Sequence, residues 1–139
     1  MNDEVRTIMD TNPRTTSPNK NVGELSLEML NEGITQLPVV DNEELVGLIT
    51  VHDLWKKYEN KASIADLKVS DVMNTNIIRI SPKDKIGTAA ELFADRRFKT
   101  IPVVNRDNKL RGIITAFDII KVTFKREYTS PILYQEAFS

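Results

Sequence analysis

The amino-acid sequence repeats itself at an offset of 64 residues. The stretch 5–23 matches 69–87 at seven positions, and "PVV" recurs at the same offset. After one inserted residue, "GLITVHD" recurs as "GIITAFD". A repeat of this kind indicates two copies of one structural unit. We therefore expect a first repeat at 1–60, a linker at 61–68, a second repeat at 69–126 and a C-terminal tail at 127–139.

Each copy has the pattern of a β-α-β-β-α unit that opens with a short helical turn. In the second copy, "NIIRIS" predicts a strand, and "PKDKIGTAAELFADRR" predicts a helix with an apolar stripe that Ser81 or Asp84 caps. "TIPVV" and "LRGIIT" predict two strands around a turn, and a helix begins at Ala116. A unit of about 60 residues is marginal alone. We predict an α/β (α+β) fold with two repeats packed sheet to sheet about a pseudo-twofold axis, with one shared core and two equivalent clefts.

Composition excludes many function classes. The chain has no cysteine, and His52 is its only histidine, so thiolate chemistry and a histidine-rich metal site are excluded. A net charge of −1 gives no general attraction to nucleic acid or anionic lipid. No apolar run reaches the ~20 residues of a membrane span, and no secretory signal is present. We expect a cytoplasmic protein that is not an enzyme, has no metal site, and binds neither nucleic acid nor a membrane.

The recurrent Thr-x-x-Asp has two interpretations. Thr50 with Asp53, and Thr115 with Asp118, stand where a helix begins, and a single such motif is more often a capping box than a binding site. A helix N-terminus also favours a phosphate, and a carboxylate suits the paired hydroxyl donors of a ribose. Two copies of the motif at an inter-repeat cleft add weight to the second interpretation, and the family resemblance described next makes it the favoured one.

In these motifs the chain resembles the cystathionine-β-synthase (CBS) domain family in its tandem-pair form. The resemblance extends from Val5 to about Lys125 and depends on "LPVV" and "IPVV", on "GLITVHD" and "GIITAFD", and on "VMNTNIIRISP" with its partial copy "IMDTNPRTTSP". It implies a non-catalytic regulatory module that binds AMP, ADP, ATP or S-adenosylmethionine. It also implies a homodimer and a regulated protein that the sequence does not identify.

The family pattern builds each site from both repeats. Site one would combine Thr50, His52 and Asp53 with Ile77, Ile78, Lys99 and Thr100, and site two would combine Thr115, Phe117 and Asp118 with Pro13, Arg14, Thr35 and Gln36. Site two has Arg14 in place of the apolar wall, and Pro13 removes a backbone donor. We therefore expect AMP or a close adenine nucleotide in site one. Asp53 would hold the ribose, Thr50 and the following N–H groups the phosphate, and Ile78 the base, with Lys99 adding charge.

The alternative function is a protein-interaction or dimerisation module with vestigial clefts. Its motivation is the poorer first copy and the absence of a partner domain in the sequence. The resemblance implies a flat, disc-like homodimer, and apolar residues in the closing helices of the two repeats support an interface of this kind. These residues are Leu54, Trp55, Ile119, Ile120, Val122 and Phe124. The tail "YTSPILYQEAFS" is also apolar enough to pack on the dimer or on a neighbouring chain.

Overall fold

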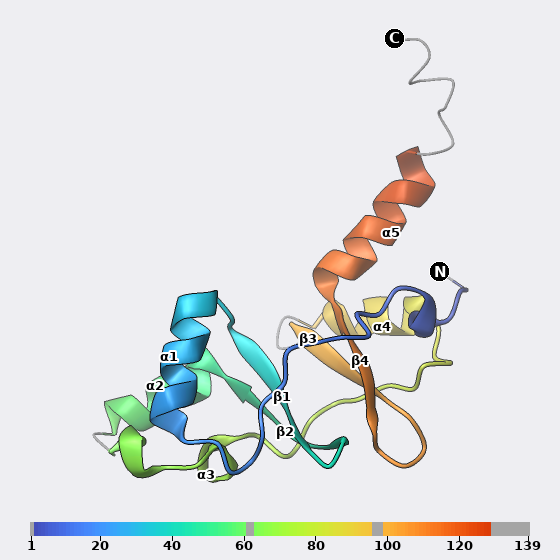
Figure 1. The fold of residues 1–139 in the computed structure, drawn as a ribbon. Coiled ribbons are helices and arrows are strands. Elements are labelled where there is room, and N and C mark those ends of the chain that lie inside the picture. Colours follow the sequence, from blue (N-terminus) through green and yellow to red (C-terminus); the bar gives the residue numbers. More distant parts are fainter. Residues whose placement is uncertain (1, 61–62, 96–98, 129–139) are drawn as a thin grey trace.

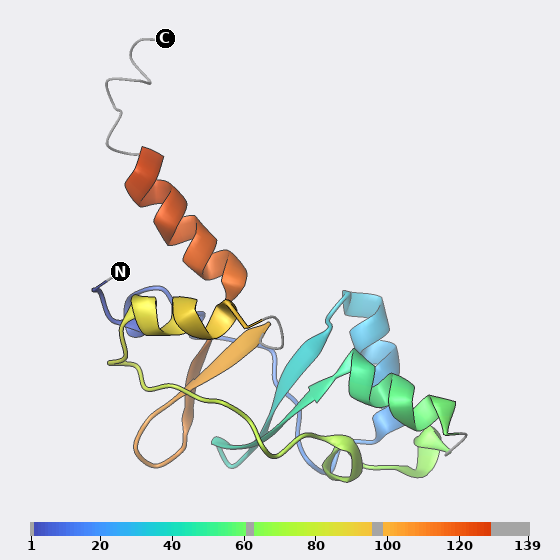
Figure 2. The same ribbon diagram turned by 180° about the vertical axis from the view of Figure 1, so that it is seen from behind.

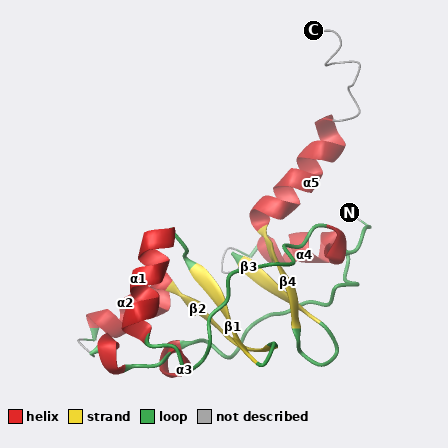
Figure 3. Ribbon diagram, in the orientation of Figure 1, coloured by secondary structure: helices red, strands yellow, loops and turns green. Residues whose placement is uncertain are grey.

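The computed structural model describes residues 2–60, 63–95 and 99–128 (Figure 1), so the predicted packing of the tail lies almost wholly outside the described residues. Strands lie in the middle of the molecule, with helices on two flanks (Figure 3). The predicted α+β fold is confirmed. The elements in chain order are η1 (Val5–Thr7), α1 (Val22–Glu32), β1 (Gln36–Asp41), β2 (Glu44–Thr50), α2 (Val51–Glu59), η2 (Ile64–Asp66), α3 (Val69–Val72), α4 (Ile86–Phe93), β3 (Thr100–Val104), β4 (Leu110–Thr115) and α5 (Ala116–Tyr128).

Each repeat is built on one antiparallel hairpin. In β1–β2, Val39 pairs with Gly47, and in β3–β4 the equivalent Val103 pairs with Gly112. The register shifts directly after these pairs in both hairpins, so even the irregularity is repeated. The first repeat carries α1 and α2 on its outer side, and the second carries α4 and α5 (Figures 1 and 2). None of the helices in the described ranges is both long enough and apolar enough to cross a membrane.

The predicted first strand of each repeat is reduced to a single bridge. Thr16 pairs in parallel with Val39, and Ile80 pairs in parallel with Val103. The rest of "NIIRIS" does not pair with the sheet. Residues 76–78 of this segment line a cavity between the repeats instead. The prediction of a full strand there was wrong, and each sheet has two strands.

The start of α4 also differs from the prediction. The helix begins at Ile86 after Lys85, and no side chain caps it. The carboxylate of Asp84 instead accepts the backbone N–H of Ser81 at 2.7 Å and closes the preceding loop. In contrast, α1 begins with a side-chain cap, since Asn21 accepts the N–H of Glu24 at 3.0 Å.

The repeats have two cores and not the single shared core that we expected. One buried cluster lies under α1, α2 and the β1–β2 hairpin, and the other lies under α4, α5 and the β3–β4 hairpin. The short N-terminal segments are exchanged between them. Val5 of the first copy is buried in the second cluster, and Val69 of the second copy is buried in the first. The exchange makes each core depend on both copies, which compensates for the small size of each repeat.

Backbone pairing fixes the exchanged segments and the hairpin turns. Asp10 and Ile113 exchange two N–H···O=C bonds of 2.9 and 3.0 Å, and Leu48 and Asn74 exchange two of 2.9 and 2.8 Å. At the turns, the N–H of Leu45 donates to the carbonyl of Asn108 at 2.9 Å, and the Asn108 side chain donates back to the Leu45 carbonyl at 2.7 Å. Hydrogen bonds therefore link the two repeats at three places.

Candidate functional site

The N-terminus of α2 is closed by a reciprocal capping box. The Thr50 hydroxyl accepts the N–H of Asp53 at 3.1 Å, and the Asp53 Oδ2 accepts the N–H of Thr50 at 3.2 Å. The same Oδ2 lies 2.8 Å from the Thr50 hydroxyl, which must donate because an ionised carboxylate only accepts. Both bonds to the carboxylate use Oδ2, so Oδ1 has no hydrogen-bond partner among the described residues. Asp53 can therefore cap the helix and still accept hydrogen bonds from a ligand.

The helix end offers fewer donors than we expected for a phosphate. The single proton of the Thr50 hydroxyl is directed at Asp53. The N–H of Val51 donates to the carbonyl of Thr35 at 3.0 Å, and the N–H of Asp53 is taken by Thr50. In the first turn, His52 keeps the one N–H that no described residue accepts. This helix end therefore presents mainly an acceptor, the free oxygen of Asp53, which suits the donors of a ribose better than a phosphate.

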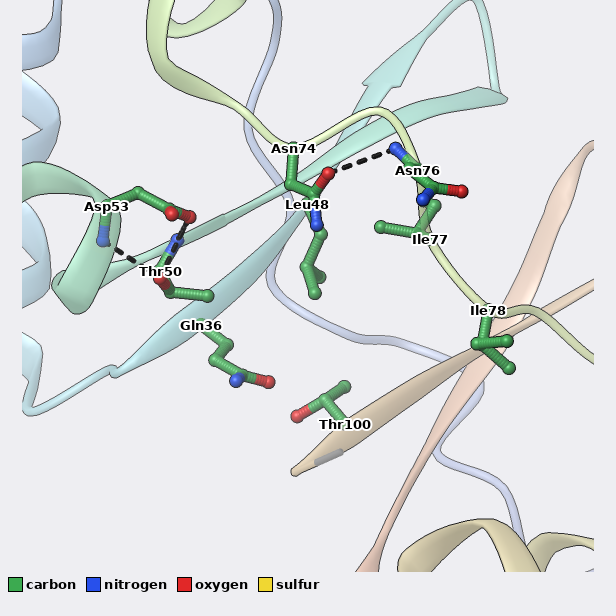
Figure 4. A pocket seen from close by; sticks show the side chains of 9 residues that line it. All are labelled: Gln36, Leu48, Thr50, Asp53, Asn74, Asn76, Ile77, Ile78 and Thr100. Atoms are coloured by element: carbon green, nitrogen blue, oxygen red, sulfur yellow. Dashed lines mark hydrogen bonds between the residues drawn. The ribbon is translucent and has the colours of Figure 1, made fainter. Parts of the chain in front are cut away.

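Asp53 opens onto a cavity of about 450 Å³ between the two repeats (Figure 4). This volume is within the range of ~300–1,000 Å³ that is usual for small-molecule sites. The first repeat contributes residues from β1, β2 and α2, and the second contributes the segment that left the sheet together with the start of β3. The lining residues are Gln36, Leu48, Thr50, Asp53, Asn74, Asn76, Ile77, Ile78 and Thr100.

The cavity brings together five of the seven residues predicted for site one. Thr50 and Asp53 lie at one end and Ile78 at the other, as Figure 4 shows. Ile78 is 43% exposed, which leaves an apolar surface at the wall of the cavity. His52 and Lys99 are exposed and are not among the lining residues.

Gln36, which we assigned to site two, lines this first cavity instead. The cause is the hairpin register, which places Gln36 directly opposite Thr50. Its side-chain oxygen is buried and has no partner among the described residues. An unpaired buried acceptor costs about 1–3 kcal/mol, so Gln36 is suited to receive a donor from a ligand.

Sequence reasoning missed Leu48, Asn74 and Asn76. A signal for the two asparagines was present, because Asn is typical of turns that a side chain closes. The Asn74 side chain accepts the N–H of Asn76 at 3.0 Å, and in the first copy Asp10 accepts the N–H of Asn12 at 2.9 Å. The turn therefore occurs in both copies. In the second copy it precedes Ile77 and Ile78, which line the cavity.

Site two keeps the capping box but not the rest of its predicted set. Asp118 Oδ2 accepts the N–H and the hydroxyl of Thr115 at 2.8 and 3.1 Å. Arg14 is held away by carboxylates of α1, 2.5 Å from Glu32 and 3.9 Å from Glu28.

The remaining residues predicted for site two are also dispersed. Thr35 lines a groove between α1 and α2, and Phe117 is exposed beneath the ammonium group of Lys121 at 5.5 Å. Asp118 borders a cavity of about 220 Å³ that contains none of the other predicted residues. Among the described residues, only the Thr50 motif therefore faces a cavity with its predicted partners.

The fold and the cleft define a tandem pair of small α+β repeats with a binding-site geometry between them. The family model for the CBS domain matches residues 5–54 and 69–125. The chain belongs to the CBS-domain family, so the resemblance seen in the sequence is confirmed.

Relatives of known name support the same assignment. Over 115 residues, 82% of this chain, the sequence is 40% identical to the inosine-5'-monophosphate dehydrogenase of Methanocaldococcus jannaschii. The chain spans only 22% to 35% of the length of this dehydrogenase and of three other curated relatives. Its similarity to enzymes is therefore confined to their CBS part.

Solved structures share the fold. CBSX2 of Arabidopsis thaliana in complex with AMP superposes with a TM-score of 0.80 at 24% identity, covering 90% of this chain and 98% of that one. The CBS domain pair of protein MJ0100, in complex with 5'-methylthioadenosine and S-adenosylmethionine, superposes with a TM-score of 0.75 at 24% identity, covering 91% and 99%.

Proposed function

We propose that the chain is a regulatory module that binds an adenosine-containing ligand, with AMP as its preferred form, in the cavity at Thr50 and Asp53. One observation carries the proposal: both repeats contribute to a cavity of nucleoside size that contains a carboxylate with one uncommitted oxygen. Complexes of similar CBS pairs with AMP, 5'-methylthioadenosine and S-adenosylmethionine support this ligand class.

Each part of the ligand has a partner in the proposal. Asp53 Oδ1 accepts the ribose hydroxyls, and Ile78 lies against the base. Because the Thr50 proton is committed to Asp53, the phosphate is directed to the N–H of His52 and to Lys99. Lys99 is exposed and stands directly before the cavity residue Thr100 in the sequence.

A thermal-shift panel tests the proposal. It compares AMP, ADP, ATP, adenosine, 5'-methylthioadenosine and S-adenosylmethionine. A ligand that binds only the folded state stabilises it by about 2.7 kcal/mol at a concentration of ~100 Kd, so at least one of these ligands should raise the melting temperature. If none does so at millimolar concentration, the ligand-binding proposal is wrong and the clefts are vestigial.

Replacing Lys99 by alanine should separate phosphate binding from nucleoside binding. The affinity for AMP should fall by about 3- to 10-fold, as expected for a partly exposed charge interaction. The affinity for adenosine should stay unchanged, since adenosine carries no phosphate. Isothermal titration of both ligands against both proteins measures the difference. An equal loss for the two ligands would show that Lys99 acts on the shape of the cavity and not on the phosphate.

Replacing Gln36 by leucine should move stability and affinity in opposite directions. The change removes a buried oxygen that has no partner, so the free energy of unfolding should stay the same or rise by about 1 kcal/mol. Ligand affinity should fall by about 5- to 10-fold because the cavity loses an acceptor. Chemical denaturation and calorimetric titration check the two effects. A variant that is destabilised but binds normally would assign Gln36 a structural role only.

We also propose that the chain forms a homodimer, the arrangement expected from its exposed apolar side chains. Trp55, Ile120 and Phe124 are exposed, whereas Leu54 and Ile119 from the same predicted set are buried in the two cores. In this proposal the dimer changes a surface that a regulated protein or a catalytic domain contacts, depending on whether the ligand is bound. The greater length of the relatives is the reason to consider a catalytic domain. Light scattering should give twice the 15.8 kDa mass of one chain.

A further inference from the structure

A small cavity lies between the N-terminal segment of the first copy and helix α5 of the second. The lining residues are Thr7, Ile8, Asp118, Lys121, Val122 and Lys125, and none of them lines the cavity at Asp53. Its volume is about 220 Å³. Drug-sized sites begin at ~300 Å³, and a cavity of ~150 Å³ holds benzene. The cavity therefore suits a molecule smaller than a nucleotide.

Two of the lining side chains offer hydrogen-bond acceptors. The Thr7 hydroxyl donates its single proton to the carbonyl of Glu4 at 2.7 Å, so only its lone pairs remain for a ligand. Asp118 accepts the N–H and the hydroxyl of Thr115 at 2.8 and 3.1 Å, and both bonds use Oδ2. Its Oδ1 has no hydrogen-bond partner among the described residues. The two free acceptors suit an ammonium group.

Two other lining side chains offer positive charge. Lys121 and Lys125 follow each other by one turn of α5, and an ammonium group donates hydrogen bonds but accepts none. In the described part of the chain, Lys121 contacts the ring of Phe117 at 5.5 Å and forms no ion pair. Asp118 is the only carboxylate among the lining residues. The lysines therefore suit a carboxylate that a ligand supplies.

The remaining two lining residues are apolar. Ile8 and Val122 are half-buried and pack on the second core, so the cavity has an aliphatic floor. Val122 and the three charged lining residues of α5 are three, four and seven residues apart, which puts them on one face of the helix. Ile120 and Phe124, which are exposed, lie on a different face. The cavity is therefore separate from the apolar surface proposed for the homodimer.

The first repeat does not contain the same set of side chains. The position equivalent to Thr7 is Asp71, which adds a carboxylate. The position equivalent to Val122 is Lys57, which replaces an apolar residue by a cation. The combination of two acceptors, two lysines and an aliphatic floor therefore belongs to the second repeat and does not follow from the fold that both repeats share.

We propose that this cavity binds a free α-amino acid with an aliphatic side chain. Asp118 and Thr7 accept hydrogen bonds from the α-ammonium group, and the two lysines bind the α-carboxylate. Ile8 and Val122 contact the aliphatic side chain. A phosphate would be repelled by the Asp118 carboxylate, and a simple amine would be repelled by the lysines. A zwitterion satisfies both signs of charge at once. The proposal does not depend on the nucleotide ligand of the other cavity.

Amide NMR spectra of the full chain, titrated with three related compounds, test the proposal. L-Leucine carries both charged groups, leucinamide lacks the carboxylate, and 4-methylpentanoate lacks the ammonium group. Leucine should shift the amide signals of Thr7, Ile8 and Val122. The other two compounds should bind about 10-fold more weakly, because each loses the hydrogen bonds of one charged group.

Asp118→Asn should weaken leucine binding by about 10-fold. The bonds from Thr115 should select the amide oxygen, so the cap persists while the free acceptor becomes a donor. Asp53→Asn is the matched control, because it changes the equivalent cap outside this cavity and should leave leucine binding unchanged. Lys121→Gln should weaken leucine by about 3- to 10-fold and leave leucinamide unaffected, since leucinamide has no carboxylate.

The absence of shifts at the three amides with millimolar leucine would overturn the proposal. Equal affinities for leucine and 4-methylpentanoate would show a general anion site, and equal affinities for leucine and leucinamide would show a cation site. Either result contradicts an amino-acid site. Shifts of these amides by AMP and not by leucine would assign the cavity to the nucleotide. AMP binding is followed separately at the amide of Ile77, so failure of this proposal and failure of the nucleotide proposal are distinguishable.

Discussion

Replacing Asp53 by alanine is expected to weaken the binding of AMP by about 10- to 100-fold. The reason is the loss of Oδ1, the one carboxylate oxygen in the cavity that no described residue uses. Hydrogen bonds to a charged group contribute about 1.5–3 kcal/mol. The same change removes the reciprocal cap of α2, so the free energy of unfolding should fall by about 1 kcal/mol. Titration calorimetry and denaturant unfolding on one protein sample measure the two losses.

Asp53→Asn separates the cap from the ligand contact. The N–H and hydroxyl of Thr50 donate to Oδ2, so they should select the amide oxygen for that position and leave the amide nitrogen facing the cavity. The cap then persists while the free acceptor becomes a donor. Asn should therefore keep most of the stability but bind AMP as poorly as Ala does. If Asn binds as tightly as the parent, Asp53 is a cap and the site assignment is incorrect.

Asp118→Ala is the matched control in the second repeat. It removes the same cap from α5, and Asp118 borders a cavity that lacks the other predicted residues of its site. It should cost about 1 kcal/mol of stability and leave AMP binding within about 3-fold of the parent. A loss of affinity as large as that of Asp53→Ala would show that the second Thr-x-x-Asp motif also binds ligand.

The repeated Thr-x-x-Asp motif located the correct helix ends, because a capping box is a local structure that sequence alone determines. Gln36 was assigned to the wrong cleft because its position depends on the hairpin register and not on its own neighbours in sequence. Antiparallel pairing brings the first residue of β1 opposite the last residue of β2, Thr50. The donors of the α2 end could not be counted from sequence either, since the partner of the Val51 N–H is the carbonyl of Thr35 in another segment.

The offset of 64 residues predicted two similar units but not the exchange between them. Val5 and Val69 occupy equivalent positions, and each is fully buried, but in the core of the other copy. The same small apolar residue suits both cores, so local sequence does not distinguish the two arrangements. The predicted single core was wrong for the same reason, because exchanged segments can join two repeats without merging their interiors.

The glycines of the two Gly-x-x-Thr motifs provide the last prediction, and their role follows from the exchange. An added Cβ at Gly112 would lie 2.7 Å from the backbone carbonyl of Asp10 and 2.9 Å from the side chain of Met9. At Gly47 it would lie 2.5 and 2.9 Å from the sulfur and Cγ of the Met73 side chain, and 3.2 Å from the backbone carbonyl of Asn74, a less severe backbone contact than the one at Gly112. Gly112→Ala should therefore be the more destabilising change, since it displaces a backbone segment that is paired with Ile113.

Overpacking of this kind costs about 1–3 kcal/mol, and we expect Gly112→Ala to lower the melting temperature by about 3–10 °C. Gly47→Ala should cost less, because Met73 can adopt another rotamer. Met73→Ala combined with Gly47→Ala should recover part of that loss, which a double-mutant cycle measures. Melting temperatures in the reverse order, with Gly47→Ala the worse, would mean that the paired N-terminal segment moves away from β4 more easily than a methionine side chain rotates. The exchanged segment would then be a weak part of the second core, contrary to its backbone pairing and to the complete burial of Val5.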